Sequence, residues 1–199
     1  MQLKDSKTYL NLAKSYAGEC QAQVRYKFIE YGARMEGYTC LAELVDKVVY
    51  NEFNHARMFY TELQKASSEQ INNIEVCAGY PFKQKWDLQE NLRLASEDEH
   101  DEYTKIYPEF KKIALEEGFE DIARLYDMII QVESCHYKMF NDLYTQMKSG
   151  TLYKKEKPVL WKCAGCGYEA TSKSAWEVCP LCKAKQGFVM LKLSSGESE

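Results

Sequence analysis

The tetrapeptide Glu133-Ser134-Cys135-His136 contains a Glu and a His three residues apart, which lie on one face of a helix and can bind one metal ion together. The segment Asn51-Glu52-Phe53-Asn54-His55 has the same Glu-x-x-His spacing inside a second helical pattern. A single motif of this kind is usually a surface Glu followed by a partly buried His. Two motifs that use two of the chain's three histidines instead indicate a shared metal site.

Four helical patterns surround these motifs. Apolar residues recur at helical spacing over 6–36, 39–66, 87–117 and 119–149. In the first helix we expect the apolar stripe to consist of Leu10, Ala13, Ala17, Val24, Phe28, Tyr31 and Met35. Ser6 is a plausible N-cap, and Asp87 with Glu90 predicts a capping box. Pro108 lacks a backbone N–H, so it predicts a kink or a restart inside the third helix.

Connection lengths set the expected topology. The break around Gly37 is short, and so is the break at Gly118, whereas 67–86 is a long segment interrupted by Asn72, Asn73, Gly79 and Pro81. Two antiparallel pairs joined by a long crossover predict an all-α four-helix bundle of ferritin-like topology. We expect this bundle to occupy residues 1–149.

A small metal-binding domain is predicted after the bundle. Residues 150–157 are charged and end at Pro158, so we expect a linker there and a second domain over 158–199 that ends in a polar tail. Two Cys-x-x-Cys knuckles predict one tetrahedral four-thiolate site made by Cys163, Cys166, Cys179 and Cys182. A structural zinc ribbon uses the same ligands. The other four cysteines are scattered and are more often small buried residues than reactive thiols.

Bulk composition narrows the function classes. The 199-residue chain has a formal net charge of -4, which argues against nucleic acid as a partner. No apolar run approaches the roughly 20 residues of a membrane span, and the polar first residues lack a signal-peptide core. We therefore expect a cytoplasmic protein.

Acidic residues on the inward faces of the four helices complete the predicted metal site. This inward set consists of Glu19, Glu52, His55, Glu99, Glu102, Glu133 and His136. One Glu from each of two helices and a Glu-x-x-His from each of the other two form the known pattern of a carboxylate-bridged dimetal site. Burying these carboxylates without cations would be prohibitive, and oxygen ligands with imidazole suit iron or manganese.

The chain resembles rubrerythrin over almost its whole length. The resemblance rests on the sequence around Glu19, the run Glu99-His100-Asp101-Glu102 before Tyr103 to Pro108, and both Glu-x-x-His motifs. It implies that two irons are held by Glu19, Glu52, His55, Glu99, Glu133 and His136. The Cys-Gly-Tyr sequence after the first knuckle and Trp161 resemble rubredoxin, which implies one iron at the four-cysteine site.

The resemblance also implies individual roles. Glu102 would exchange with His55 as a ligand when the site is oxidised, and Tyr26 and Tyr107 would donate hydrogen bonds to ligating carboxylates. Ordinary aromatic core is the alternative for both tyrosines. The acidic run Glu97-Asp98 departs from the family pattern and leaves Glu97 open as a competing ligand. His100 is expected off the metal face.

By the same resemblance, the expected activity is the reduction of hydrogen peroxide to water, protecting an anaerobe or microaerophile from oxidative stress. Electrons would arrive through the four-cysteine iron from an NAD(P)H-linked reductase or a rubredoxin, and two chains would pair head to tail as a homodimer. Two alternatives stay open. One is a ferroxidase or iron-handling protein, and the other is a non-catalytic redox sensor or electron-transfer module.

Overall fold

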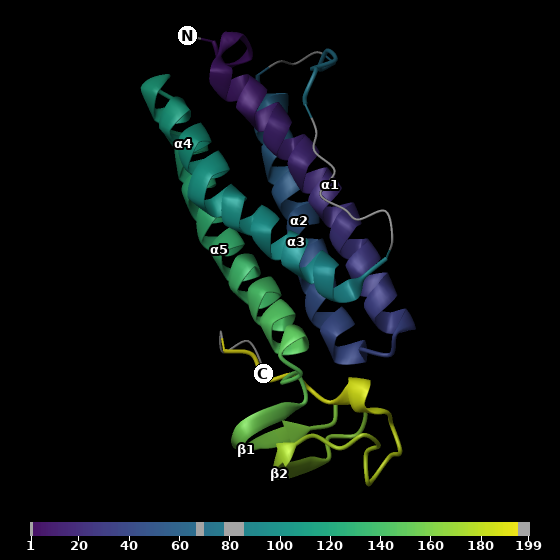
Figure 1. Cartoon of the computed structure of the whole chain (residues 1–199). Helices are drawn as coiled ribbons and strands as arrows, with labels where there is room; N and C mark the ends of the chain where they lie inside the picture. Colours follow the sequence, from purple (N-terminus) through teal and green to yellow (C-terminus); the bar gives the residue numbers. More distant parts are fainter. Residues whose placement is uncertain (1, 67–69, 78–85, 195–199) are drawn as a thin grey trace. The chain divides into compact units, whose positions relative to one another are not determined.

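The computed structural model describes residues 2–66, 70–77 and 86–194, most of which are helical (Figure 1). The helices are η1 (Leu3–Asp5), α1 (Lys7–Met35), α2 (Thr39–Lys65), α3 (Leu88–Asp101), η2 (Glu102–Ile106), α4 (Tyr107–Glu116) and α5 (Glu120–Lys148). The outer limits of the four predicted helices are confirmed to within one residue. The described part of the crossover, residues 70–77, forms no helix or strand, while Gly79, Pro81 and the tail beyond residue 194 lie outside the described residues.

Local hydrogen bonds explain where the helices begin and end. The Ser6 Oγ accepts the Tyr9 N–H (3.0 Å), and the Asp87 carboxylate accepts the Glu90 N–H (2.9 Å), as N-caps do. Helix α1 has a second cap, because the Glu117 carboxylate accepts the N–H groups of Lys7 and Thr8 at 3.0 and 2.8 Å. Glycines in the left-handed region of φ end α1, α4 and α5.

The restart expected at Pro108 takes the form of a π-helical segment. In η2 the N–H of Tyr107 bonds to the carbonyl of Glu102, five residues back, directly before the proline. Pro108 has no N–H with which to continue the α-helical ladder, so the wider turn absorbs the missing bond. The extra residue in this turn brings Glu102 and Tyr107 to the interior together, where both are buried.

The inward face of α1 differs from the expected apolar stripe. Val24, Phe28, Tyr31 and Met35 are 50–71% exposed. The buried side of α1 instead carries Leu12, Ser15, Glu19, Ala22, Tyr26, Ile29 and Ala33. These residues follow the i+3/i+4 spacing of a helix face, so the buried face is regular although two of its members are polar.

Two antiparallel helix pairs joined by the crossover form the four-helix bundle, which confirms the predicted fold class. Contacts divide the chain into two compact units, Met1–Arg25, Val48–Pro81 and Glu97–Tyr137 in the first, and Tyr26–Lys47, Phe82–Ser96 and Lys138–Glu199 in the second. The first unit has an aromatic core that includes Phe59, Tyr107 and Tyr126. No helix in the described part of the chain is both long and apolar enough to cross a membrane.

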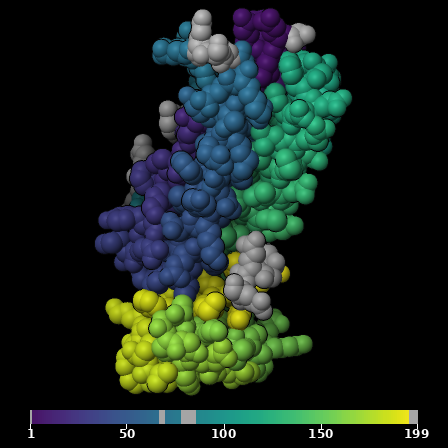
Figure 2. Space-filling model, turned by 180° about the vertical axis from the view of Figure 1, so that it is seen from behind, coloured from purple at the N-terminus to yellow at the C-terminus, as the bar shows by residue number. Residues whose placement is uncertain are grey.

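The C-terminal region in the second unit is a small antiparallel hairpin with loops. Strand β1 (Lys154–Lys162) pairs with β2 (Glu169–Ser174), and the short helix η3 (Gln186–Phe188) follows. Strand β1 begins inside the stretch 150–157 that the sequence predicts as a linker, so half of that stretch is a strand. Residues of this region lie next to the turn between α1 and α2 (Figure 2). Gly187 packs against Gly37 there, and Tyr153 stacks on Tyr38.

Candidate metal centres

Two groups of buried side chains in the first unit could each hold a metal ion. The first consists of Glu19, Glu52, His55 and Glu133, and the second of Glu52, Glu99, Glu133 and His136. Within each group, one ligand atom from every residue lies within 4.8 Å of all the others. Glu52 and Glu133 belong to both groups, which is the arrangement expected of two carboxylates that bridge a pair of metals.

Both histidines turn the same nitrogen toward the carboxylates. The Nδ1 atom of His55 lies 2.8 Å from Glu133 and 3.4 Å from Glu52. The Nδ1 atom of His136 lies 2.7 Å from Glu133 and 2.9 Å from Glu52. The imidazole rings are 5.9 Å apart between centroids. Each Glu-x-x-His motif therefore presents its two ligands to one point, as its helical spacing predicts.

The donor set fits cations rather than an internal hydrogen-bond network. Both carboxylate oxygens of Glu52, Glu99 and Glu133 and the Nδ1 atoms of both histidines are buried without a hydrogen-bond partner. Such groups carry a large desolvation cost unless a cation compensates them. Two divalent ions would satisfy these atoms at once, and the mixture of carboxylate and imidazole is a ligand set that iron accepts.

Without metal, three of the buried carboxyl groups favour their protonated form. Burial raises the pKa values of Glu19, Glu99 and Glu102 well above the ordinary range, and neighbouring carboxylates raise them further. A metal ion would have to displace these protons, so metal binding at this site competes with hydrogen ions.

Glu52 and the histidines form the charged part of the metal-free cluster. Burial raises the pKa of Glu52, but the adjacent His136 and His55 outweigh burial and lower it overall. Burial lowers the pKa of His55, yet the adjacent carboxylates of Glu133, Glu19 and Glu52 raise it to about 12. The pKa of His136 is raised in the same way. Protonated imidazoles thus occupy the electrostatic role that metal ions would take.

The remaining predicted site residues lie around this core at different depths. Glu102 is buried but belongs to neither four-residue group, whereas its expected exchange partner His55 belongs to one. The hydroxyl of Tyr107 donates a hydrogen bond of 2.5 Å to Glu19. Glu97, the competing ligand, is exposed and lies outside both groups. His100 packs against Tyr103 and Tyr137, off the metal face.

Tyr26 is placed in the core of the second unit. Its ring is buried and packs 4.8 Å from that of Phe140. This contact agrees with the core role left open for Tyr26, and its hydrogen bond to a ligating carboxylate stays a prediction.

Two further residues near the site were not identified from the sequence. The side chain of Asn51 contacts Nε2 of His136 at 3.1 Å, and Arg25 forms an ion pair with Asp98. Burial raises the pKa of Asp98, and Arg25 offsets part of that rise. Asn51 stands directly before Glu52, but one position along a helix turns a side chain by about 100°, so spacing does not connect it to the site.

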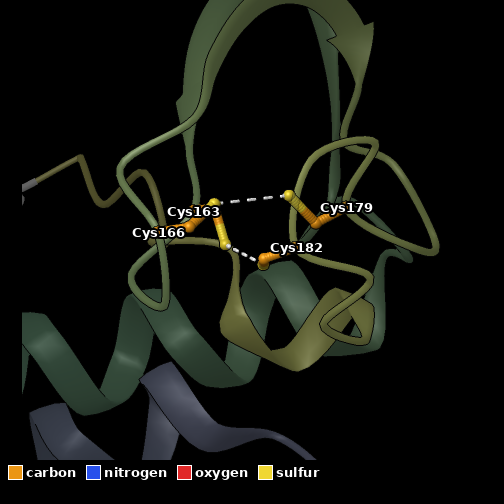
Figure 3. Close-up of side chains that lie close together, drawn as sticks. All are labelled: Cys163, Cys166, Cys179 and Cys182. Atoms are coloured by element: carbon orange, nitrogen blue, oxygen red, sulfur yellow. Dashed lines mark hydrogen bonds between the residues drawn. The ribbon is translucent and has the colours of Figure 1, made fainter.

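The four knuckle cysteines converge on one point in the second unit (Figure 3). Their sulfur atoms lie 3.7 Å apart in the pairs Cys163–Cys182 and Cys166–Cys179. A disulfide requires about 2.05 Å, whereas four thiolates at about 2.3 Å from a central ion are roughly 3.8 Å apart. The distances therefore fit a tetrahedral metal site and exclude disulfides between these pairs.

The two knuckles have the same backbone turn. The carbonyl of Cys163 accepts the N–H of Gly167 (2.8 Å), and the carbonyl of Cys179 accepts the N–H of Lys183 (3.0 Å). Gly167 and Lys183 have φ values of 75° and 65°. Burial raises the pKa of Cys179, but backbone N–H groups of Cys182 and Leu181 lower it to about 7, which favours the thiolate that a metal needs.

Comparison with known proteins extends both findings. A family model described as Rubrerythrin matches residues 11–144, and one described as Rubrerythrin, rubredoxin-like domain matches residues 161–188. A rubrerythrin from Clostridium perfringens is 39% identical over 186 residues, which are 94% of each chain. A rubrerythrin from Nitratidesulfovibrio vulgaris is 33% identical and covers 90% of this chain and 91% of its own.

Solved structures show the same fold at lower identity. Nigerythrin in a partially reduced state is 22% identical with a TM-score of 0.62, covering 96% of this chain and 94% of its own. A bacterioferritin from Desulfovibrio desulfuricans is 22% identical with a TM-score of 0.65, covering 73% of this chain and 82% of its own. At this identity the two structures support the fold alone.

Proposed function

The chain belongs to the rubrerythrin family, and from that premise we propose that it is a peroxidase that reduces hydrogen peroxide to water at the carboxylate–histidine site. Its cofactors are two irons at that site and one rubredoxin-type iron at the four cysteines, which make it an iron-based redox protein. The observation that carries the proposal is the pair of buried groups that share Glu52 and Glu133.

The reaction consumes one hydrogen peroxide, two electrons and two protons, breaks the O–O bond and releases two waters. When bound, the two irons supply one electron each to that cleavage. Glu52 and Glu133 would bridge them, while Glu19 with His55, and Glu99 with His136, would complete the two positions. The protein's task is to hold both positions at fixed spacing and to compensate the change in charge.

Glu102 is suited to that compensation. Four ionised carboxylates, those of Glu19, Glu52, Glu99 and Glu133, carry four negative charges, which equal the charge of two ferrous ions. Exchange of neutral His55 for anionic Glu102 would add one negative charge to the site and so compensate one unit of positive charge. Burial raises the pKa of Glu102, and the charges of the nearby Glu19 and Glu99 raise it further.

Tyr107 would act on the same site by positioning Glu19. Burial raises the pKa of Tyr107 well above its ordinary value, so the phenol stays neutral and remains a donor at physiological pH. Its hydrogen bond to Glu19 leaves the second oxygen of that carboxylate for a metal. Tyr26 would play a corresponding role for another ligating carboxylate.

Cys163, Cys166, Cys179 and Cys182 would hold an iron that supplies one-electron transfer, the chemistry needed to return electrons to the carboxylate–histidine site. An NAD(P)H-linked reductase or a rubredoxin would supply those electrons, and two chains would pair head to tail. The family match to a rubredoxin-like domain over residues 161–188 supports an electron-carrying role for this iron over a structural zinc.

Competition between oxidants tests the proposal. The full chain, with all three irons reduced under anaerobic conditions, is mixed with one equivalent of hydrogen peroxide or of oxygen while the visible absorption of the oxidised four-cysteine iron is followed. We expect fast recovery with peroxide and slow recovery with oxygen. Faster recovery with oxygen would favour a ferroxidase, and slow recovery with both would favour a redox sensor.

A further inference from the structure

The two histidines of the dimetal site differ at the nitrogen that points away from the carboxylates. Nε2 of His136 lies 3.1 Å from the carboxamide nitrogen of Asn51. For Nε2 of His55, the described residues provide no hydrogen-bond partner. Both imidazoles turn Nδ1 toward the carboxylates, but only that of His136 also has a hydrogen-bond partner at Nε2.

The imidazole of His136 is clamped by two consecutive residues of α2. Glu52 faces Nδ1 at 2.9 Å, and Asn51 faces Nε2 at 3.1 Å. A neutral imidazole that binds a metal through Nδ1 carries its hydrogen on Nε2, which makes Nε2 a donor. A half-turn of the Asn51 carboxamide places its oxygen at that position, where it can accept this hydrogen.

The sequence explains why His55 has no equivalent support. The two motifs correspond as Asn51-Glu52-x-x-His55 and Val132-Glu133-x-x-His136. Each histidine contacts the Glu of the opposite motif, at 2.8 Å for His55 and 2.9 Å for His136. The residue before that Glu is Asn51 for His136 but Val132 for His55, and a valine side chain cannot accept a hydrogen bond.

We propose that Asn51 is a positioning residue that fixes His136 as a permanent metal ligand through an Nε2–H to Oδ1 hydrogen bond, and that Val132 leaves His55 as the ligand able to depart. This inference rests on the proposed function, because it explains which histidine Glu102 can replace. Outer hydrogen bonds of this kind typically change metal affinity by roughly 10- to 100-fold.

Reciprocal substitutions test the assignment in the full chain, with the four-cysteine iron retained and Zn(II) loaded into the bundle as a diamagnetic probe. Proton–nitrogen NMR then reports the Nε2–H of each histidine. In the unmodified protein, we expect a slowly exchanging signal for His136 and none for His55. Asn51→Val should remove the first signal, and Val132→Asn should create the second. Asn51→Asp, which keeps an acceptor, should restore the His136 signal.

Metal affinity separates positioning from general damage. Asn51→Val should weaken Zn(II) binding in the bundle roughly 10- to 100-fold without changing the thermal stability of the metal-free bundle. Asn54→Val is the matched control, because Asn54 lies on the same helix and bonds to the Tyr50 carbonyl. Equal affinities for Asn51→Val and wild type, or an unprotected Nε2–H of His136 in wild type, would overturn the inference.

Failure of the proposed function would look different. A wild-type protein that showed the expected signals but did not reduce peroxide would contradict the peroxidase proposal and leave the anchoring of His136 standing. Zn(II) binding and the Nε2–H signals do not depend on turnover.

Discussion

At the scale of single residues, the hydroxyl of Tyr107 is the most direct support that the protein gives to a predicted ligand. Replacing it with Tyr107→Phe removes the hydrogen bond to Glu19, a loss of about 1.5–3 kcal/mol for a bond to a charged group. We expect the reduced site to react with peroxide roughly 10-fold more slowly or worse. Stopped-flow mixing with peroxide measures this rate.

Tyr126→Phe is the control for that variant. Tyr126 is an equally buried neighbour whose ring lies 5.7 Å from that of Tyr107, but its hydroxyl bonds to Ser15 at 3.1 Å. An equal loss of rate in both variants would mean that core packing, and not support of Glu19, determines the effect.

Protonation of the buried ligands links metal removal to pH. Burial raises the pKa values of Glu19, Glu99 and Glu102, so the folded metal-free state holds protons that the unfolded chain releases above about pH 4.5. His55, whose pKa is raised to about 12, likewise holds a proton in the folded state that the unfolded chain releases above about pH 6.5. Stability of the metal-free bundle should therefore fall as pH rises from about 5 to 9.

Thermal melts of the metal-free and metal-loaded bundle across that range test this dependence. The loaded site is already deprotonated, so the difference in melting temperature should widen as pH rises. Glu52 affects stability in the opposite direction, because its lowered pKa stabilises the fold above about pH 4.5. Its contribution to stability is constant between about pH 5 and 9. A difference that stayed constant or narrowed would contradict the proton competition.

Site residues that are close together in the sequence could be predicted to lie together, and those far apart could not. Glu52 with His55, and Glu133 with His136, are three residues apart, so helical spacing alone places each pair together. Asn51 and Arg25 contact residues 85 and 73 positions away, and their roles depend on how the helices pack. No spacing rule indicates such partners.

At the scale of elements, the two knuckle turns offer a matched pair of substitutions. Gly167 and Lys183 hold equivalent left-handed positions, and a side chain there costs roughly 1–2 kcal/mol. Lys183→Gly should raise the stability of the four-cysteine region by about 0.5–1 kcal/mol, after the greater freedom of glycine in the unfolded chain is counted. Gly167→Ala should lower it.

Denaturant titration followed by the visible absorption of the four-cysteine iron measures both changes. A Cβ added to Gly167 meets no atom within 4 Å, so any loss of stability comes from the backbone conformation itself. An alanine variant as stable as wild type would show that the left-handed turn imposes no cost.

Helix α1 and the π-helical segment η2 each differ in part from the structure that the sequence pattern predicts. On α1, the inward position predicted for Glu19 is confirmed, but four members of the expected apolar stripe, Val24, Phe28, Tyr31 and Met35, are exposed. The inward face also contains Ser15, and polar residues at a metal site conceal a core face from hydropathy. Pro108 predicted a restart correctly. Its form, a π turn that buries both Glu102 and Tyr107, depends on tertiary packing that the proline alone does not specify.

At the scale of the whole molecule, the C-terminal region is docked through a contact without space for a side chain. A Cβ at Gly187 would lie 1.7 Å from the carbonyl oxygen of Gly37, so backbone must move to admit it. Gly187→Ala should loosen the docking while the four-cysteine iron keeps its spectrum. Hydrogen exchange at residues 37–39 should accelerate, whereas Gly165→Ala, with no contact closer than 3.6 Å, should leave it unchanged. Unchanged exchange in Gly187→Ala would contradict this docking.

A helical bundle followed by a four-cysteine region was predictable from the sequence. The lengths of the helical patterns, the long crossover and the Cys-x-x-Cys spacing are each read from residues that are close together in the chain. The segment 150–157 misled because β1 exposes most of its residues in a two-stranded sheet, so its composition is that of a linker. Within the same segment, Leu152 is buried and Tyr153 stacks on Tyr38, and neither charge nor proline content indicates these contacts.

We propose above that the buried carboxylate–histidine site reacts with peroxide and draws its electrons from the four-cysteine iron. Its most direct test compares wild type with Glu133→Ala, which removes a carboxylate shared by both metal positions and leaves the four cysteines intact. Both proteins are reduced, mixed anaerobically with one equivalent of hydrogen peroxide, and followed by the visible absorption of the four-cysteine iron. We expect rapid recovery in wild type and recovery at least roughly 100-fold slower in Glu133→Ala. Equal rates in the two proteins would show that peroxide reacts elsewhere in the protein, and the buried site would not be the peroxidase site.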